Sequence, residues 1–587
     1  MTVRKIGLKA AATIVLLAGL TGQTVAFNID EGVEGFWYEA DLDARRGWGF
    51  EYLPTGPEEG VFFVSGYVYD DAGAATWLTG QANVIDGEFE ADLPLQACSG
   101  GEFGPAEGSP VCTDWGNLNV VFNSCNSAEF TFSSDNIDNF SQDFDHFRII
   151  VGGGNEDRCI YQSEFTSCPA GTTPAAGMER ACVLSGTYND DLTLTNDTIW
   201  VLAGGVFIGD KAAIGDPVPL GGPTLTIEAG TRIVGSGGSN NALYISRGSR
   251  INAEGQPHAP IVMTGAKVAS QGAASGDWGG LVINGAAPLN TCAEGVCEAI
   301  GEGDSGAYGG DDPYDNSGVL RYVRVQFAGE KINDEDELNG IAFQGVGSGT
   351  VVDYVQVHRN ADDGIEFFGG TVNAKHLVLT DIEDDSVDWT QGWQGKLQYV
   401  LVQQIQDDTV DTDRGMELDN LEQDNDALPR SGGVMANFTL VGKAGELGIN
   451  PRRGTGGNFS NFIVTNFDRC LDIDSASTFA AAGTPDNLTG VLTMENTILN
   501  CNTNIVENDE DNPDPWSVQE FFDNQPGNSE MNPMLEGVFP PEDADYLSGY
   551  HLDPMVYDDF FEDVDYVGAF RSRDSAWIWN WTEFYTW

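Results

Sequence analysis

The sequence predicts an all-β protein: a right-handed parallel β-helix (β-solenoid) preceded by a small antiparallel β domain. The main observation is a short pattern, two large apolar residues flanking a smaller or acidic one, that recurs between residues 339 and 502. This alternation is typical of a strand with one buried face. Successive middle residues are 24, 22, 29, 31 and 24 residues apart, which is the spacing of one solenoid coil. The copies are Ile341-Ala342-Phe343, Ile365-Glu366-Phe367, Val387-Asp388-Trp389, Met416-Glu417-Leu418, Leu447-Gly448-Ile449 and Leu471-Asp472-Ile473.

A second strand recurs in the same rhythm, at residues 354–357, 376–379, 399–402, 438–441 and 462–464. The turns between the strands are rich in Gly, Asn and Asp, and we expect two strands per coil with no room for helices. The apolar residues of the first pattern should then point into the coil. They are Ile365, Phe367, Val387, Trp389, Met416, Leu418, Leu471 and Ile473.

The chain divides into five parts. Three cations precede the apolar run 10–20, and a small-residue cleavage site ends at Ala26, so residues 1–26 are predicted to be a secretory signal peptide. No later run reaches the roughly 18 apolar residues of a membrane span, and we expect a secreted or outer cell-surface protein. The other predicted parts are an antiparallel β-sandwich or barrel module (27–165), a disulfide-bounded linker (166–186), the β-helix (187–505) and a C-terminal capping segment (506–587). In the last part, Trp577, Trp579, Trp581 and Trp587 are expected to cover the open end of the β-helix.

Charge and cysteines limit the possible partners. The formal net charge is −64 at pH 7, which excludes nucleic acid and anionic membranes as partners of the bulk surface. It favours bound cations, a salty medium, or both. Ten cysteines in a secreted chain imply disulfides, and no Cys/His cluster suggests zinc. Sequence order suggests the local pairs Cys98–Cys112, Cys125–Cys159, Cys168–Cys182, Cys292–Cys297 and Cys470–Cys501.

Two groups of motifs resemble known proteins. The strings GFW at 35–37, GWGF at 47–50 and WLTG at 77–80 resemble N-terminal β modules of secreted proteobacterial proteins. The strings ISRGSRINAEG at 245–255, PIVMT at 260–264, GDWGGL at 276–281, IEFFGG at 365–370 and VDYVGAF at 564–570 look like large secreted β-helix proteins of marine proteobacteria and Bacteroidetes. This second resemblance covers about residues 183–587. It implies the fold and secretion, but no activity, because that family has no settled one.

A column of acids is the candidate functional site. Glu366, Asp388 and Glu417 should point outward on three consecutive coils, about 4.8 Å apart. Asp362, Asp384 and Asp413 each stand four residues earlier. Two carboxylates ~5 Å apart repel by roughly 3 kcal/mol at an effective dielectric of ~20, so the column is costly unless cations or raised pKa values relieve it. These six acids are therefore predicted metal ligands, with calcium as the ion; the alternative is a solvated face whose aspartates cap turns.

The same region offers ligand-binding residues. Trp393 and Arg414 are expected to flank the column, and Gly448 to leave a notch where Arg452 and Arg453 could meet an anionic group such as a uronate. Acidic loops at 309–316, 333–337 and 507–512 are further calcium candidates, with simple solvation as the alternative.

Three function classes remain open. The first is a binding protein for an extracellular polysaccharide or cell-surface component, with calcium on the acidic face. The second is a polysaccharide lyase or glycoside hydrolase acting in the β-helix groove. Its carboxylates would be Asp362-Asp363 with Glu366, or Asp384-Asp385 with Asp388, and its base Arg414, Arg452 or Lys396. The third is a structural or assembly protein. Catalytic fingerprints such as a Walker loop or a dinucleotide motif are absent from the sequence.

Overall fold

The structure is a computed structural model that describes eight strand segments between residues 35 and 149 and most of the chain from 167 to 582. The predicted signal peptide, the Cys125–Cys159 pair and Trp587 lie outside the described residues. In the described part, no helix is long and apolar enough to cross a membrane. The short gaps after residue 167 are 177, 179, 220, 238–239, 258, 268–272, 293–296, 333–336, 406–411, 508–513, 545, 547–558 and 580.

The N-terminal module is an antiparallel barrel. Each strand pairs with the next, and β8 pairs back with β1. Trp37, Trp48 and Phe130 are buried in its core, so two of the three tryptophans in the sequence motifs pack inside, whereas Trp77 is 53% exposed. The strands are β1 (Gly35–Glu39), β2 (Gly47–Gly56), β3 (Glu59–Tyr69), β4 (Ala75–Ile85), β5 (Glu90–Ser99), β6 (Val111–Ser124), β7 (Ser127–Ser134) and β8 (Phe140–Ile149).

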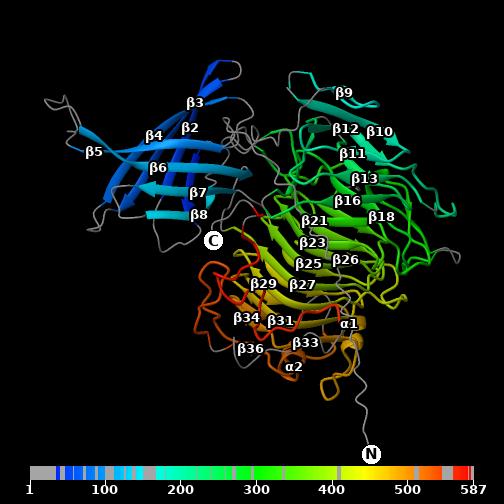
Figure 1. Ribbon diagram of the computed structural model, residues 1–587. Coiled ribbons are helices and arrows are strands. Elements are labelled where there is room, and N and C mark those ends of the chain that lie inside the picture. The colour runs from blue at the N-terminus through cyan, green and yellow to red at the C-terminus, as the bar shows by residue number, and fades with distance from the viewer. Residues whose placement is uncertain are drawn as a thin grey trace, which may run out of the picture.

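The second module is a parallel β-helix, as predicted. Its strands stack along one axis from β10 to β36 (Figure 1). Its first coils contain β10 (Ala181–Tyr188), β11 (Leu192–Leu194), β12 (Ile199–Ile208), β13 (Thr224–Ile227), β14 (Arg232–Gly235), β15 (Ala242–Ile245), β16 (Arg250–Glu254), β17 (Ile261–Thr264) and β18 (Gly280–Asn284). Two short strands, β19 (Ala299–Ile300) and β20 (Ala307–Tyr308), pair with each other, and β9 (Thr173–Pro174) pairs antiparallel with β10.

The later coils alternate a short and a long strand. The short strands form the first sheet, which carries the acids. They are β22 (Ile341–Gln344), β24 (Ile365–Phe368), β26 (Val387–Thr390), β28 (Arg414–Leu418), β30 (Leu447–Pro451), β32 (Arg469–Leu471) and β35 (Thr503–Ile505). The long strands are β21 (Gly318–Gln326), β23 (Val351–His358), β25 (Asn373–Thr380), β27 (Lys396–Gln403), β29 (Val434–Val441) and β31 (Gly457–Thr465), followed by β33 (Leu492–Glu495), β34 (Ile498–Asn500) and β36 (Ser529–Glu530).

The later coils have two strands each, as expected, whereas the first coils have three, since β16 and β17 both pair with the one long strand β21. The long strands bend at one residue with positive φ, and the segments before and after it pair separately: β21 pairs with β16 before Tyr322 and with β17 after it. The bend residues stack coil upon coil, with ring centroids 4.5 Å apart for Tyr322–Tyr354, 4.1 Å for Tyr354–His376 and 4.9 Å for His376–Tyr399. Asn437 and Asn461 continue the row, and asparagine adopts positive φ readily.

The interior matches the predicted pattern. All eight residues expected to point inward belong to one continuous core, with exposures of 0 or 1%. The core stacks in register, as in the Phe343–Phe367 pair, whose ring centroids are 5.4 Å apart.

Trp393 also belongs to this core, which corrects its predicted place beside the acids. Its side chain is fully buried, with its ring centroid 4.6 Å from that of Phe367 and 5.1 Å from that of Trp389. The indole Nε1 donates a hydrogen bond to the carbonyl of Val372 at 3.2 Å. The turn after β26 directs this large apolar side chain inward, so Trp393 is not available to a ligand.

The C-terminal part departs from the sequence prediction in two ways. Two short helices, α1 (Ala476–Ala482) and α2 (Val518–Asp523), interrupt the last coils, and Phe479, Phe521 and Phe522 join the core there. Trp577 and Trp581 pack against the side of the coils, not against the open end. Their apolar cluster includes Val378 and Leu401 on the outer side of β25 and β27, where large apolar residues leave a face to be covered.

Four of the predicted disulfides are confirmed: Cys98–Cys112, Cys168–Cys182, Cys292–Cys297 and Cys470–Cys501. The last of these joins β32 to the chain just before β35, which fits a role in holding the final coils together.

Replacing Trp393 tests its place in the core. We expect Trp393→Ala to lower the free energy of unfolding of the β-helix by about 3–5 kcal/mol, because it removes a large buried ring and leaves a cavity. Urea unfolding followed by circular dichroism measures this. The control Trp77→Ala, in the barrel, should leave the β-helix transition within about 0.5 kcal/mol of wild type. Equal transitions for Trp393→Ala and wild type would contradict the burial.

Candidate cation site on the outer face of the first sheet

The strand register places three acids side by side on the first sheet. Glu366 of β24 pairs with Asp388 of β26, and Asp388 pairs with Glu417 of β28. The next residue in the row is Asn450 and not Gly448, since β30 pairs Asn450 with Glu417. A Cβ on Gly448 would lie 2.6 Å from both the Cys470 carbonyl oxygen and the Val464 side chain. The predicted notch is therefore wrong: Gly448 lies at a crowded position, and an amide follows the acids.

The sequence had suggested a solvent-exposed face for these acids, but the structure shows them largely covered. Glu366 is 8% exposed and Glu417 9%, although both point out of the coil. The row continues toward the N-terminus as Ala342 and Val282, and these two residues belong to an outer apolar cluster. The chain between β18 and β22 folds over the sheet and contributes Leu289, Tyr308 and Leu338 to that cluster. This cover reduces the access of water to the neighbouring carboxylates.

Carboxylates gather in four overlapping groups of three. In each group, one oxygen of every residue lies within 4.8 Å of the others. We call these residues the acidic face. The groups are Asp362/Asp363/Asp384, Asp363/Glu366/Asp388, Asp384/Asp385/Asp413 and Asp385/Asp388/Glu417.

The structure adds Asp363 and Asp385 to the six predicted metal ligands. The signal was present in the sequence as the doublets Asp362-Asp363 and Asp384-Asp385, in which only the first residue was predicted to bind metal. The Asp385 backbone N–H donates to Asp363 Oδ1, and the Arg414 N–H donates to Asp385 Oδ1, each at 3.0 Å. Each second aspartate thus fixes the turn of the following coil, which positions the remaining acids.

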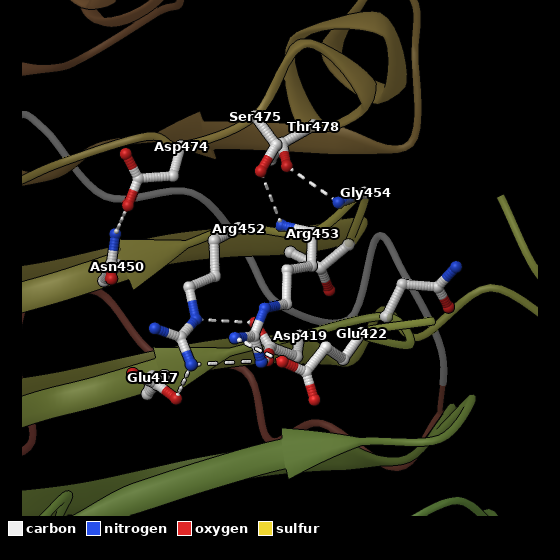
Figure 2. A network of polar contacts seen from close by, with 12 residues as sticks. Glu417, Asp419, Glu422, Asn450, Arg452, Arg453, Gly454, Asp474, Ser475 and Thr478 are labelled. Carbon is white, nitrogen blue, oxygen red and sulfur yellow. Dashed lines mark hydrogen bonds and ion pairs between the residues drawn. The ribbon is translucent and has the colours of Figure 1, made fainter. Parts of the chain in front are cut away.

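Three arginines, Arg414, Arg452 and Arg453, form ion pairs with acids at one end of the acidic face. Arg414 Nη1 lies 2.6 Å from Asp413 Oδ2, 3.0 Å from Glu417 Oε1 and 3.6 Å from Asp385 Oδ2. Figure 2 shows Arg452 and Arg453 directed toward Asp419. The Arg452 Nε–Asp419 Oδ1 distance is 2.8 Å and the Arg453 Nη1–Asp419 Oδ2 distance 2.7 Å.

Arg452 and Arg453 were predicted to be open to an anionic ligand, and these contacts show that both already pair with acids of the protein. Arg452 also pairs with Glu417, and Arg453 with Glu422 at 3.2 Å. Their side chains are 20% and 33% exposed, and both are engaged by acids of the protein itself. Sequence reasoning missed Asp419, because it follows the strand pattern by one residue and belongs to no repeat.

Burial and mutual repulsion raise the pKa values of the acidic face. Burial, and then the charge of Asp388, raise the pKa of Glu366 well above its usual range. Burial, and then the charge of Glu417, do the same for the pKa of Asp388. Burial and the charge of Asp384 raise the pKa of Asp362 to about 7. Protons or a bound cation are needed to stabilise so many adjacent carboxyl groups.

The loop 309–316, one of the three acidic loops that were further calcium candidates, contributes no acid to these groups in the described part of the chain. In the loop 309–316, Asp312 accepts the Tyr314 N–H at 2.9 Å, and Asp315 accepts the Ser317 hydroxyl at 3.2 Å. Among the described residues, the acids of this loop do not enter any of the four groups. Residues 333–336 and 508–513 of the other two loops lie outside the described residues.

Comparison with known protein families agrees with this architecture. The model of the pectate-lyase-like β-helix domain matches residues 186–533, which is more than half of the chain. The chain belongs to this family. The matched region contains the whole acidic face and the arginines at its end. Comparisons with curated proteins and with solved structures gave no match.

The raised pKa of Asp362 predicts a pH effect on stability in calcium-free solution. Its folded pKa of about 7 lies above the ordinary value of 3.8, so the folded state binds this proton more tightly. Stability linked to it should fall as pH rises from about 4 to about 7. Thermal unfolding in chelator should therefore show that Asp362→Asn becomes more stable relative to wild type between pH 5 and pH 7.5. The same difference at both pH values would contradict this.

Proposed function

We propose that the protein is an extracellular binding protein. It holds an anionic polysaccharide on the acidic face through a divalent cation, with calcium as the ion. The observation that carries the proposal is a dense group of carboxylates on the outer face of a pectate-lyase-like β-helix. The family suggests a role connected with polysaccharides. The acidic groups could hold a metal ion. Four disulfides are consistent with an oxidising, extracellular environment.

Charge argues for a bridging cation. A chain with a formal charge of −64 repels a polyanion unless positive charge lies between them. Arg414, Arg452 and Arg453 are already paired with protein acids. Asp388, in the middle of the acidic face, is partly exposed. A calcium ion held there keeps coordination positions for oxygens from outside the protein, because calcium takes six to eight oxygen ligands.

A glycoside hydrolase is the second candidate, and one observation favours it. Burial raises the pKa of both Asp388 and the neighbouring Glu417, but Arg452 and Arg414 oppose the effect of burial at Glu417. A protonated acid beside an ionised one is the arrangement that glycosidic bond hydrolysis uses.

A lyase reaction that uses an arginine base is less well supported. Burial lowers the pKa of Arg414, but Asp385, Glu417 and Asp413 outweigh it and raise that pKa above its usual value. Lys396 lies elsewhere, with its Nζ 6.0 Å from the Phe560 ring centroid.

Affinity electrophoresis tests the binding function. Gels containing polygalacturonate or alginate should retard the wild-type protein in calcium and not in chelator, because the ion links the two sets of carboxylates. Gels containing a neutral glucan should retard it in neither. We expect Glu366→Gln to reduce the calcium-dependent retardation at least tenfold in apparent affinity.

The control is Glu422→Gln, which removes a carboxylate outside the four acidic groups. It should migrate like wild type. Retardation by anionic polymers that persists in chelator, or the absence of retardation by both polymers in calcium, would contradict the proposal. Release of reducing sugar from either polymer would favour the hydrolase.

A further inference from the structure

The acidic face repeats on successive coils with one exception. The residue three positions before the outward acid is Asp363 on the coil of Glu366 and Asp385 on the coil of Asp388, but Arg414 on the coil of Glu417. Arg414 keeps the place of the second aspartate in the turn, since its N–H bonds Asp385 just as the Asp385 N–H bonds Asp363. A positive side chain thus replaces a negative one at a single step of the stack.

This exchange neutralises the end of the acidic face nearer the C-terminus. The Arg414 guanidinium lies within ion-pair distance of Asp385, Asp413 and Glu417, at 3.6, 2.6 and 3.0 Å. These three acids belong to the two groups at that end. Arg452 contacts Glu417 as well. The guanidinium therefore already provides the positive charge that a metal ion would provide there.

The group formed by Asp363, Glu366 and Asp388 has no such partner. Within the described residues, no lysine or arginine forms an ion pair with any of the three. Asp388 Oδ1 is buried and has no hydrogen-bond partner among the described residues. The group therefore combines negative charge with an unused carboxylate oxygen.

Asn339 is a second and independent sign of a ligand at this group. Its side chain is fully buried, and its amide nitrogen donates to Glu366 Oε2 and to Glu302 Oε2, each at 2.8 Å. The amide oxygen on the same planar group has no partner among the described residues. A buried amide oxygen left unpaired typically costs about 1–3 kcal/mol, and contact with a bound cation would remove that cost.

We propose that one calcium ion binds at Asp363, Glu366 and Asp388, with Asn339 at its edge, and that the Arg414 guanidinium takes the place of a second ion one coil further on. This inference rests on the proposed function and specifies its cation site. Oxygens of one ion at calcium distances of about 2.3–2.6 Å can be up to about 5 Å apart, and the three carboxylate oxygens lie within 4.8 Å of one another. A mixed set of carboxylate and amide oxygens suits calcium better than magnesium, which demands a tighter octahedron.

Calorimetric titration of calcium into chelator-stripped full-length protein tests the stoichiometry. A buffer with about 0.15 M NaCl screens diffuse binding to the acidic surface. Wild type should bind one ion per chain, and Glu366→Gln and Asp388→Asn should bind at least tenfold more weakly. Arg414→Asp restores the repeated doublet and should bind two ions, whereas Arg414→Lys keeps the charge and should bind one. Arg453→Gln, which changes an arginine that contacts Asp419 and Glu422, should also bind one.

Three results would overturn the inference: no calorimetric binding by wild type, equal binding by Glu366→Gln and wild type, or a single ion bound by folded Arg414→Asp. If Arg414→Asp does not fold by circular dichroism, the Glu366→Gln comparison still decides the position of the ion. The electrophoresis experiment separates this inference from the proposed function. If the protein binds one calcium ion but neither polymer retards it, the proposed function is wrong and this site remains. If a polymer retards the protein and no calcium binds, the site is wrong.

Discussion

In-register stacking of coils is the constraint on which the rest of this structure depends. A parallel β-helix places equivalent residues of neighbouring coils about 4.8 Å apart, so every row of side chains is a row of close neighbours. Stacking stabilises aromatic residues, as in the row from Tyr322 to Tyr399, and apolar residues pack into the core. Stacked carboxylates are destabilised, because each pair repels by roughly 3 kcal/mol at an effective dielectric of ~20. A row that contains Glu366, Asp388 and Glu417 therefore needs a compensating partner.

Different parts of the acidic face obtain that partner in different ways. Backbone N–H groups bond Asp363 and Asp385, and guanidinium groups neutralise Glu417. The apolar cluster over Ala342 limits water at the other end and so strengthens the remaining repulsion. Among the described residues, the acid that stays uncompensated is Asp388, whose Oδ1 is buried without a hydrogen-bond partner and which forms no ion pair. This imbalance, more than the total negative charge of the chain, is the physical argument for a cation.

The sequence was sufficient for the fold because the fold is repetitive. Six copies of one apolar pattern predicted the inward residues, and local order predicted the disulfides that the structure describes. The features that sequence reasoning missed depend on single departures from the repeat. The register moves by two residues at β30, which puts Asn450 where Gly448 was expected. Trp393 turns inward after a strand end, and Asp419 captures two arginines from a neighbouring coil. Such departures follow from tertiary contacts that periodicity does not encode.

The central claim is that the acidic face is kept because it holds one metal ion beside a built-in guanidinium. The most direct measurement is X-ray diffraction from crystals grown in calcium, with anomalous data after exchange for terbium. The account predicts one anomalous peak within about 2.3–2.6 Å of oxygens of Asp363, Glu366 and Asp388, and none beside Arg414. A peak beside Arg414 would contradict it. So would crystals that bind the metal at other positions but contain only water on the acidic face.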